Sequence, residues 1–252
     1  MNKLSVVIIT FNEERNIARC LESIHTIADE VVVVDSFSAD TTPQICKQYG
    51  ARFISHDWEG YAKQKNFANS QASYDWILSM DADEALSEEL QQSILDIKNQ
   101  IFENTVFSMN RLMNYCGQWI HHGSWYPETK IRIFDRRNAF WEDLKVHELL
   151  KVPDGTKIRH LKGDILHYSY YTIEEHVRQF NKFARLWAED AVERKKKVSF
   201  SAAYTHAFWK FIHDYFIKAG FLDGHYGFII SKINARYVCQ KYKLTRELYK
   251  SR

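Results

Sequence analysis

The chain has 252 residues, and its 34 Lys and Arg nearly balance its 32 Asp and Glu, so its charge gives no sign of a nucleic-acid-binding protein. Aromatic residues make up 15% of the chain and there are only 3 prolines, which excludes a disordered chain and allows an ample core. The 4 cysteines are widely spaced, the N-terminal apolar run is short, and no stretch reaches about 18 apolar residues. These features predict a cytosolic protein with reduced thiols, without a signal peptide or a membrane span.

The N-terminal part of the chain alternates short apolar runs with amphipathic stretches. Runs rich in β-branched residues are typical of strands buried on both faces. Strands are expected at Leu4–Thr10, Glu30–Asp35, Arg52–Ser55 and 76–80, and helices after Asn12, after Asp40, over Gly60–Gln71 and around 90–101. Asn12 is predicted to cap the first of these helices. The alternation predicts a parallel, doubly wound α/β sheet.

The fourth predicted strand stops abruptly at the acidic run Asp81-Ala82-Asp83-Glu84. In an extended chain Asp81 and Asp83 point the same way, with α-carbons roughly 6–7 Å apart. Two carboxylates at the end of a strand suit one divalent cation shared with a diphosphate. A calcium loop fits badly, since Ala85 and Leu86 stand where it needs an oxygen ligand and a glycine. The simpler alternative is a helix N-terminus decorated with acids.

The pattern changes after about residue 102. Shorter, less regular strands are expected at 105–109, 130–134, 145–150 and 164–168. Between them lies an aromatic segment, Tyr115 to Tyr126, which suits either stacking on a sugar or ordinary packing under a long loop. No glycine-rich phosphate motif follows the first strand, so a metal would have to hold any phosphates.

The C-terminal part is predicted to be helical. Thr172-Ile173-Glu174-Glu175 is a capping box that opens a long helix, which the basic run 194–197 closes. A second helical stretch carries an aromatic stripe from Tyr204 to Phe216 with basic residues among it. Such a face suits a membrane interface or packing on a catalytic domain. Packing is the favoured alternative for most of it, with a basic rim toward anionic lipid.

Several motifs in a fixed order give these elements a family resemblance. SVVIITFNEERNI, EVVVVDSFSADTT and GYAKQKNFANSQASYDWILSMDADE resemble the family 2 glycosyltransferases of GT-A fold over residues 1–110. KIRIFDRR, KVHELL, GDILHYSYYTIEEH and FLDGHYG resemble the lipopolysaccharide-core subgroup, which contains β-1,4-glucosyltransferases acting on inner-core heptose. The resemblance implies a GT-A catalytic domain over 1–170, with a Rossmann-like, mostly parallel sheet. Residues 1–110 would bind the nucleotide sugar and 111–170 the acceptor, and the helical region 171–252 is a candidate for membrane association.

The resemblance also implies roles for single residues. Asp35 would accept a hydrogen bond from uracil or ribose, Asp81 would reach the ribose or a metal-bound water, and Asp83 would be the main ligand of Mg²⁺ or Mn²⁺, with His167 contacting metal or phosphate. Glu148 would be the catalytic base, with Asp143 as second choice. The remaining nucleotide-sugar residues would be Thr10, Asn12, Glu13, Lys65, Asn66, Ala82 and Arg132. For Arg132, an ordinary surface arginine on a strand is the alternative.

Taken together, the motifs predict an inverting, metal-dependent hexosyltransferase. It would move glucose from UDP-glucose to a heptose of a lipid-anchored core oligosaccharide, as a cytoplasmic protein peripheral to the inner face of the inner membrane. Phosphates and Kdo on the acceptor would attract Arg194 to Lys197. One rival is a sugar-nucleotide pyrophosphorylase, although Thr10-Phe11-Asn12-Glu13 stands where its glycine-rich, Arg-containing loop belongs. The other rival is a non-catalytic, sugar-binding scaffold of the same fold.

Overall fold

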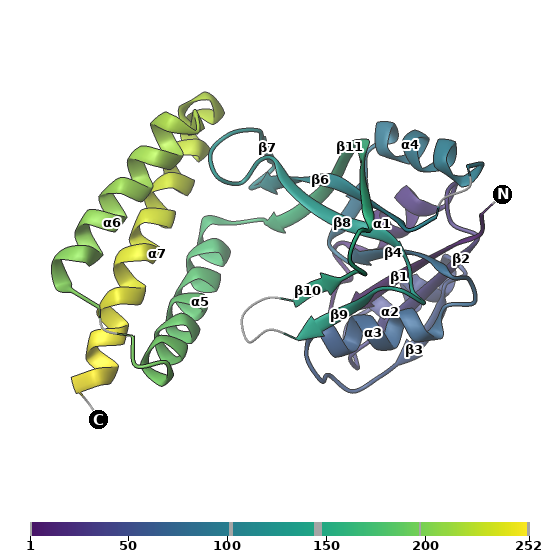
Figure 1. Cartoon of the computed structure of the whole chain (residues 1–252), viewed down its shortest axis with the longest axis horizontal. Helices are drawn as coiled ribbons and strands as arrows, with labels where there is room; N and C mark the ends of the chain where they lie inside the picture. The colour runs from purple at the N-terminus through teal and green to yellow at the C-terminus, as the bar shows by residue number, and fades with distance from the viewer. Residues whose placement is uncertain (1, 101–102, 144–147, 197, 251–252) are drawn as a thin grey trace. The chain divides into compact units, whose positions relative to one another are not determined.

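The computed structural model describes residues 2–100, 103–143, 148–196 and 198–250 (Figure 1). The chain divides into two compact units. The first contains Met1–Arg111 and Glu128–Tyr168, and the second contains Leu112–Pro127 and Ser169–Arg252.

Four parallel strands form the centre of the first unit. They are β1 (Leu4–Thr10), β2 (Glu30–Asp35), β3 (Arg52–Ser55) and β4 (Trp76–Asp81), in the order β3-β2-β1-β4. The predicted strands are therefore confirmed at these positions. Thr10 pairs with Asp35, and Ile9 pairs with Asp81. The carboxyl ends of β1, β2 and β4 thus meet at one edge of the sheet.

Antiparallel strands extend the sheet beyond β4. β8 (Glu128–Asp135), β6 (Thr105–Tyr115), β11 (Lys157–Tyr170) and β5 (Glu84–Leu86) follow in that order. β9 (Phe140–Asp143) and β10 (Glu148–Lys151) form a separate hairpin. The expected strands of this half are present at 105–109, 130–134 and 164–168 and are longer than predicted. Of the strand expected at 145–150, residues 148–150 lie in β10 and residues 145–147 lie outside the described residues.

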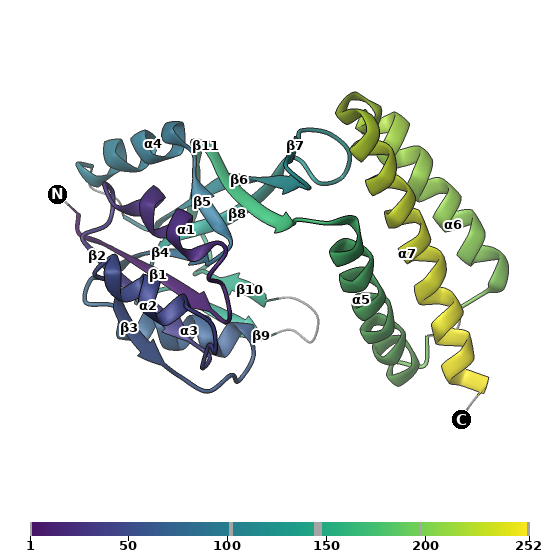
Figure 2. The same cartoon turned by 180° about the vertical axis from the view of Figure 1, so that it is seen from behind.

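Helices cover both faces of the parallel strands because alternate residues of each strand face opposite ways (Figure 2). Val6 and Ile8 pack with α1 (Ile17–Ile24) and α4 (Glu88–Lys98), whereas Val7 and Ile9 pack with α3 (Tyr61–Gln71). α2 (Thr42–Gln48) adds Cys46 to the first of these cores. This arrangement explains why every residue of β1 is buried.

One predicted cap is wrong. Helix α1 begins after Asn16, and Asn12 lies four positions earlier with a positive φ of 53°. Its side chain instead accepts a hydrogen bond from the Ala39 backbone N–H at 2.8 Å. Asn is among the few residues other than glycine that adopt this backbone conformation readily. Asn12 therefore shapes the loop that leaves β1.

The second unit is mainly helical. α5 (Ile173–Glu193) and α6 (Phe200–Ile212) both pack on α7 (Gly224–Lys250), and the short helices η1 (His213–Ile217) and η2 (Gly220–Asp223) join α6 to α7. The predicted capping box of Thr172 and Glu175 is confirmed. β7 (Gln118–Ile120) pairs with residues 113–115 and places Ile120 beside Tyr115 and Ile230 in a small core. Among the described residues, no helix is long and apolar enough to span a membrane.

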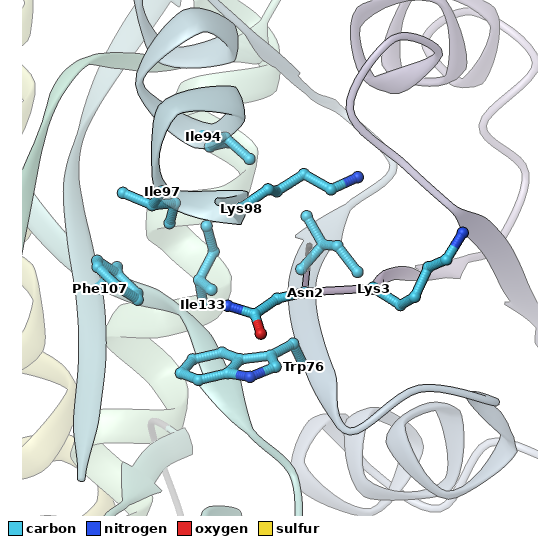
Figure 3. Close-up of a pocket in the computed structure, with 9 residues that line it drawn as sticks. Asn2, Lys3, Trp76, Ile94, Ile97, Lys98, Phe107 and Ile133 are labelled. Carbon is cyan, nitrogen blue, oxygen red and sulfur yellow. The ribbon is translucent and has the colours of Figure 1, made fainter. Parts of the chain in front are cut away.

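A small, mostly apolar pocket opens at the amino ends of the parallel strands (Figure 3). Leu4 and Trp76, the first residues of β1 and β4, line it together with Ile97 and Lys98 from the end of α4. In open α/β sheets ligands bind outside the carboxyl ends of the strands. This pocket lies at the opposite edge and is not part of the candidate site.

Candidate active site

The loops that follow β1 and β2 are joined by a hydrogen-bond network. Asp35, which is 1% exposed, accepts hydrogen bonds from the backbone N–H of Ser38 (2.7 Å) and from its hydroxyl. The Ser38 hydroxyl oxygen in turn accepts a hydrogen bond from the Asn12 backbone N–H at 2.7 Å. Thr10, Asn12 and Asp35 are therefore brought together at the carboxyl edge. The buried Thr10 hydroxyl has no hydrogen-bond partner among the described residues.

Asp81 lies between two cations. Lys65 Nζ is 3.1 Å from Asp81 Oδ1, and Arg132 Nη2 donates to Asp81 Oδ2 at 2.9 Å. Burial by itself raises the pKa of Asp81, but the charges and hydrogen bonds of Lys65 and Arg132 outweigh it and hold the pKa well below its usual range. Lys65 and Arg132 are each 2% exposed. The alternative reading of Arg132 as a surface arginine is therefore wrong.

Glu84 completes this network, although its sequence context gave it no role beyond an acid near a helix start. It is 1% exposed and accepts a hydrogen bond from Arg132 Nη2 at 2.6 Å. Arg111 Nη1 lies 3.5 Å from the same Glu84 oxygen, and the other oxygen accepts from the Asp81 backbone N–H at 3.0 Å. Glu84 thereby orients Arg132 toward Asp81. The only signal in the sequence was its place in the acidic run.

Asp83 forms a second pair with His167. Its Oδ2 is 3.0 Å from His167 Nε2, and its backbone carbonyl accepts a hydrogen bond from the Tyr168 N–H at 2.9 Å. Burial lowers the pKa of His167, but the negative charge of Asp83 and their hydrogen bond raise it more, so the pKa lies above its usual value. The two residues come together because β5 pairs with the end of β11.

Asp81 and Asp83 do not lie in one extended strand, contrary to the prediction. β4 ends at Asp81 and β5 begins at Glu84, with a turn between them at Ala82, which is buried, and Asp83, which is partly exposed. Asp81 engages Lys65 and Arg132, while Asp83 engages His167. The turn therefore gives the two carboxylates separate partners.

Glu13 lies near the Asp83–His167 pair. Burial raises its pKa to about 7, the hydrogen bond from Asn16 Nδ2 (2.8 Å) opposes this, and the charge of Asp83 adds to it. A carboxyl group with this pKa is partly protonated near neutral pH. A cation placed beside Asp83 would favour the ionised form of Glu13.

The donor atoms at Asp83 and His167 fit a cation that has other ligands as well. In the described parts of the chain, no group of three or more His, Cys, Asp or Glu is placed to hold a metal ion. Mg²⁺ is usually held by one or two protein carboxylates together with phosphate oxygens and water, and a carboxylate suits Mn²⁺ too. The Asp83 side chain is 27% exposed and therefore open to such ligands. Asp83 with His167 matches that incomplete protein ligand set.

Helix α3 holds the β9–β10 hairpin beside Lys65 through two hydrogen bonds. The Asn66 amide donates to the Trp141 carbonyl (2.7 Å) and accepts from the Trp141 N–H (2.8 Å). Lys65 Nζ lies 4.8 Å from the centre of the Trp141 ring. The Asn66 side chain, expected to approach the nucleotide, is thus engaged with the hairpin. Trp141 is a further residue that motif reading missed.

The predicted catalytic acids lie on this hairpin. Asp143 ends β9, Glu148 begins β10, and the two are paired in register. Their side chains and residues 144–147 lie outside what the structure describes. Since Trp141 is bonded to Asn66, the backbone at Asp143 is held close to the helix that carries Lys65.

Comparisons with known proteins agree on one family. The family model of glycosyl transferase family 2 matches residues 5–150. An uncharacterized glycosyltransferase of Rickettsia typhi, RT0209, is 36% identical over 245 residues, which cover 93% of this chain and 84% of that protein. The lipopolysaccharide core biosynthesis glycosyltransferase LpsC of Rhizobium meliloti is 29% identical over 255 residues, covering 96% and 93%. The crystal structure of S. aureus TarS 1-349 is 16% identical, with a TM-score of 0.47 and coverage of 99% and 92%.

Acidic side chains stand at the carboxyl edge of a sheet whose four parallel strands are covered by helices on both faces. The chain belongs to glycosyl transferase family 2, because the family model matches residues 5–150 and the Rickettsia relative covers 93% of the chain. The predicted family and fold are therefore confirmed.

Proposed function

We infer that the protein transfers glucose from UDP-glucose to a heptose hydroxyl of a lipid-anchored lipopolysaccharide core, with inversion at the anomeric carbon. The observation that carries this proposal is the Asp83–His167 pair, which adjoins the Lys65–Asp81–Arg132 network at the edge where Asp35 ends β2. The LpsC relative supports the acceptor class, because its name places it in lipopolysaccharide core biosynthesis. The enzyme would act at the inner face of the cytoplasmic membrane, as a peripheral protein.

The donor would lie along the carboxyl edge of the sheet. Asp35 would accept a hydrogen bond from the uracil or ribose, within the loops shaped by Thr10 and Asn12. Lys65 and Arg132, which Asp81 and Glu84 hold in place, would lie beside the diphosphate, and cationic N–H donors suit its oxygens. Asp83 and His167 would hold Mg²⁺ or Mn²⁺, and a bound ion would neutralise charge on the diphosphate of the departing UDP.

The acceptor would enter from the side of the β9–β10 hairpin. Its hydroxyl oxygen forms a bond to the anomeric carbon as the bond from that carbon to the UDP oxygen breaks. Glu148 would take the proton from the hydroxyl, with Asp143 as the second candidate. The support for this assignment is the family motif and the attachment of the hairpin to α3 beside Lys65.

The decisive experiment measures UDP release from UDP-glucose in the presence of a truncated core lipid. We expect release that EDTA abolishes and Mn²⁺ or Mg²⁺ restores. A sugar-binding scaffold would release no UDP, and a pyrophosphorylase would require pyrophosphate or UTP. Release that is insensitive to EDTA would refute the metal assignment, and a panel of other UDP-sugars would identify the transferred hexose.

A further inference from the structure

Figure 1 shows the turn between α6 and α7 in the helical unit. The exposed apolar side chains of this turn and of the start of α7 form a patch. We define the tip patch as Phe216, Ile217, Phe221, Leu222 and Phe228. These side chains are 55%, 57%, 47%, 60% and 42% exposed, respectively. Two consecutive apolar pairs therefore face solvent within seven residues. Monomeric soluble proteins rarely expose contiguous apolar patches of this kind without a binding role.

The aromatic members of the tip patch are connected through ring contacts. Tyr215 lies between them, with ring centroids 5.1 Å from Phe216, 6.3 Å from Phe221 and 5.7 Å from Phe228. Phe211 contacts Phe216 and Phe228 from the last turn of α6. The patch is thus one surface. Within the helical unit, Phe208 is 68% exposed and Phe216 is 55% exposed.

The backbone beneath the tip patch is rigidly built. Asp214, which is 1% exposed, accepts hydrogen bonds from Asn234 Nδ2 (2.8 Å) and Lys210 Nζ (3.0 Å). Gly220 lies against the Asp214 carbonyl so closely that a Cβ atom there would be 2.6 Å from its oxygen. The apolar side chains are therefore presented by an ordered turn.

A second buried acid secures the other side of the turn. Asp223, 6% exposed, accepts hydrogen bonds from the backbone N–H groups of His121 (3.1 Å) and His122 (2.8 Å). The Gly123 N–H donates to the Lys218 carbonyl at 2.8 Å. The loop at 121–123 therefore braces the same turn.

Lys218 supplies a positive charge at the tip patch. Between Ser199 and Phe228 the sequence contains only two acids, Asp214 and Asp223, and both are buried and hydrogen-bonded. Lys218 lies between the two apolar pairs and is exposed. An apolar surface with aromatic rings and lysine at its rim matches the interface of an anionic bilayer.

We propose that the tip patch docks the helical unit on an anionic phospholipid surface, with Phe216, Ile217, Phe221 and Leu222 entering the interface and Lys218 facing lipid phosphates. This inference rests on the proposed function only in that a lipid-anchored acceptor requires an enzyme at the membrane. It moves the lipid contact away from the basic run 194–197. There, Arg194 is paired with Asp190 at 2.8 Å, and Lys197 lies outside the described residues.

The test is co-sedimentation of the full chain with phosphatidylcholine vesicles, with and without phosphatidylglycerol. The double variant Ile217→Ser, Leu222→Ser should bind phosphatidylglycerol vesicles at least about tenfold more weakly than the parent, since two apolar side chains no longer leave water. The matched control, Ile158→Ser with Leu186→Ser, removes aliphatic groups that are 59% and 45% exposed elsewhere and should bind like the parent. Lys218→Glu, which removes no apolar group, should weaken binding several-fold and reduce its dependence on salt.

The proposal is overturned if the parent does not sediment with phosphatidylglycerol vesicles, or if the double variant binds as tightly as the parent. Self-association that the double variant abolishes, without any vesicle binding, would assign the patch to a second copy instead. Metal-dependent UDP release is measured in parallel and should be unchanged in the double variant. Vesicle binding without UDP release would refute the proposed function and leave the docking inference standing.

Discussion

Asp143 and Glu148 occupy the last and first positions of paired strands, so one short hairpin carries both candidates for the base. Glu148→Gln keeps the size of the side chain and removes its ability to accept a proton. We expect this variant to bind UDP-glucose normally and to transfer glucose roughly 10²–10⁴-fold more slowly, the usual loss for a general base. Single-turnover transfer and donor titration measure the two effects separately.

Asp143→Asn is the matched control for this change, because it neutralises the register partner of Glu148. It should reduce transfer much less than Glu148→Gln. If Glu148→Gln retains full turnover while Asp143→Asn loses it, Asp143 is the base and the order of the two candidates is reversed.

Glu84 is a buried carboxylate that contacts two arginines, and we expect it to contribute to stability. Glu84→Gln removes the charge of the buried carboxylate that Arg132 and Arg111 share, while Arg132 keeps its contact with Asp81 and Arg111 keeps its contact with Glu128. We expect the free energy of unfolding of the first unit to fall by about 1–3 kcal/mol, the cost of weakening a buried, charge-assisted hydrogen bond. Urea unfolding of the full chain, followed by a signal from the first unit, measures the change.

Glu128→Gln is a suitable comparison for Glu84→Gln. Glu128 also accepts a hydrogen bond from Arg111 (2.7 Å), but its side chain is 35% exposed. Water compensates such a loss, so the destabilisation should stay below about 1 kcal/mol. Equal effects of the two variants would show that the burial of Glu84 has no special role.

His176, near the start of α5, makes the helical unit sensitive to acid. It is fully buried, and burial lowers its pKa to about 4. The Tyr115 hydroxyl lies 2.9 Å from His176 Nδ1, within a ring of aromatic side chains. The helical unit therefore contains the neutral imidazole at neutral pH.

The pH dependence follows from this lowered pKa. The unfolded chain takes up a proton on His176 near pH 6.5 and the folded unit only near pH 4, so the unfolded state binds more protons between these values. Stability should therefore be complete above pH 6.5 and fall by about 1.4 kcal/mol per pH unit below it, until about pH 4. Thermal unfolding between pH 7 and pH 5 should show this slope, and His176→Phe should flatten it.

His206 provides the control because it also contacts a tyrosine hydroxyl, that of Tyr242 at 3.0 Å, but is exposed. His206→Phe should leave the slope of the parent unchanged. A slope that persists in His176→Phe would mean that other groups cause the loss of stability in acid.

The strands and helices that could be predicted are those with a periodic apolar pattern of sufficient length. β1, β2 and β3 were predicted to the residue, because their register is set by apolar residues facing two cores. β5 was missed, since it has three residues and depends on pairing with β11, far along the chain. The turn before it separates Asp81 from Asp83, which an argument from local geometry does not reveal.

For the molecule as a whole, the order of the motifs predicted the family. It did not predict which side chains hold the others in place. Glu84, Trp141 and Arg111 contribute through contacts between residues distant in sequence. The exposure of the tip patch was also not predictable, because the sequence pattern of an aromatic stripe is the same whether the stripe is buried or exposed to solvent.

Ligand binding should stabilise the chain only where the site described above is intact. UDP with Mn²⁺ at about one hundred times its Kd should add about 2.7 kcal/mol to the stability of the unit that binds it. For a unit of this size that raises the unfolding midpoint by several degrees. UDP with EDTA should give a smaller shift, since the diphosphate then lacks the cation that Asp83 and His167 would hold.

Asp83→Asn should abolish the Mn²⁺-dependent part of the stabilisation. Asp75→Asn, which removes a half-exposed aspartate paired with Arg137, should retain that part. An Asp83→Asn protein that UDP and Mn²⁺ stabilise as much as the parent would place the cation elsewhere, whatever happens to catalysis.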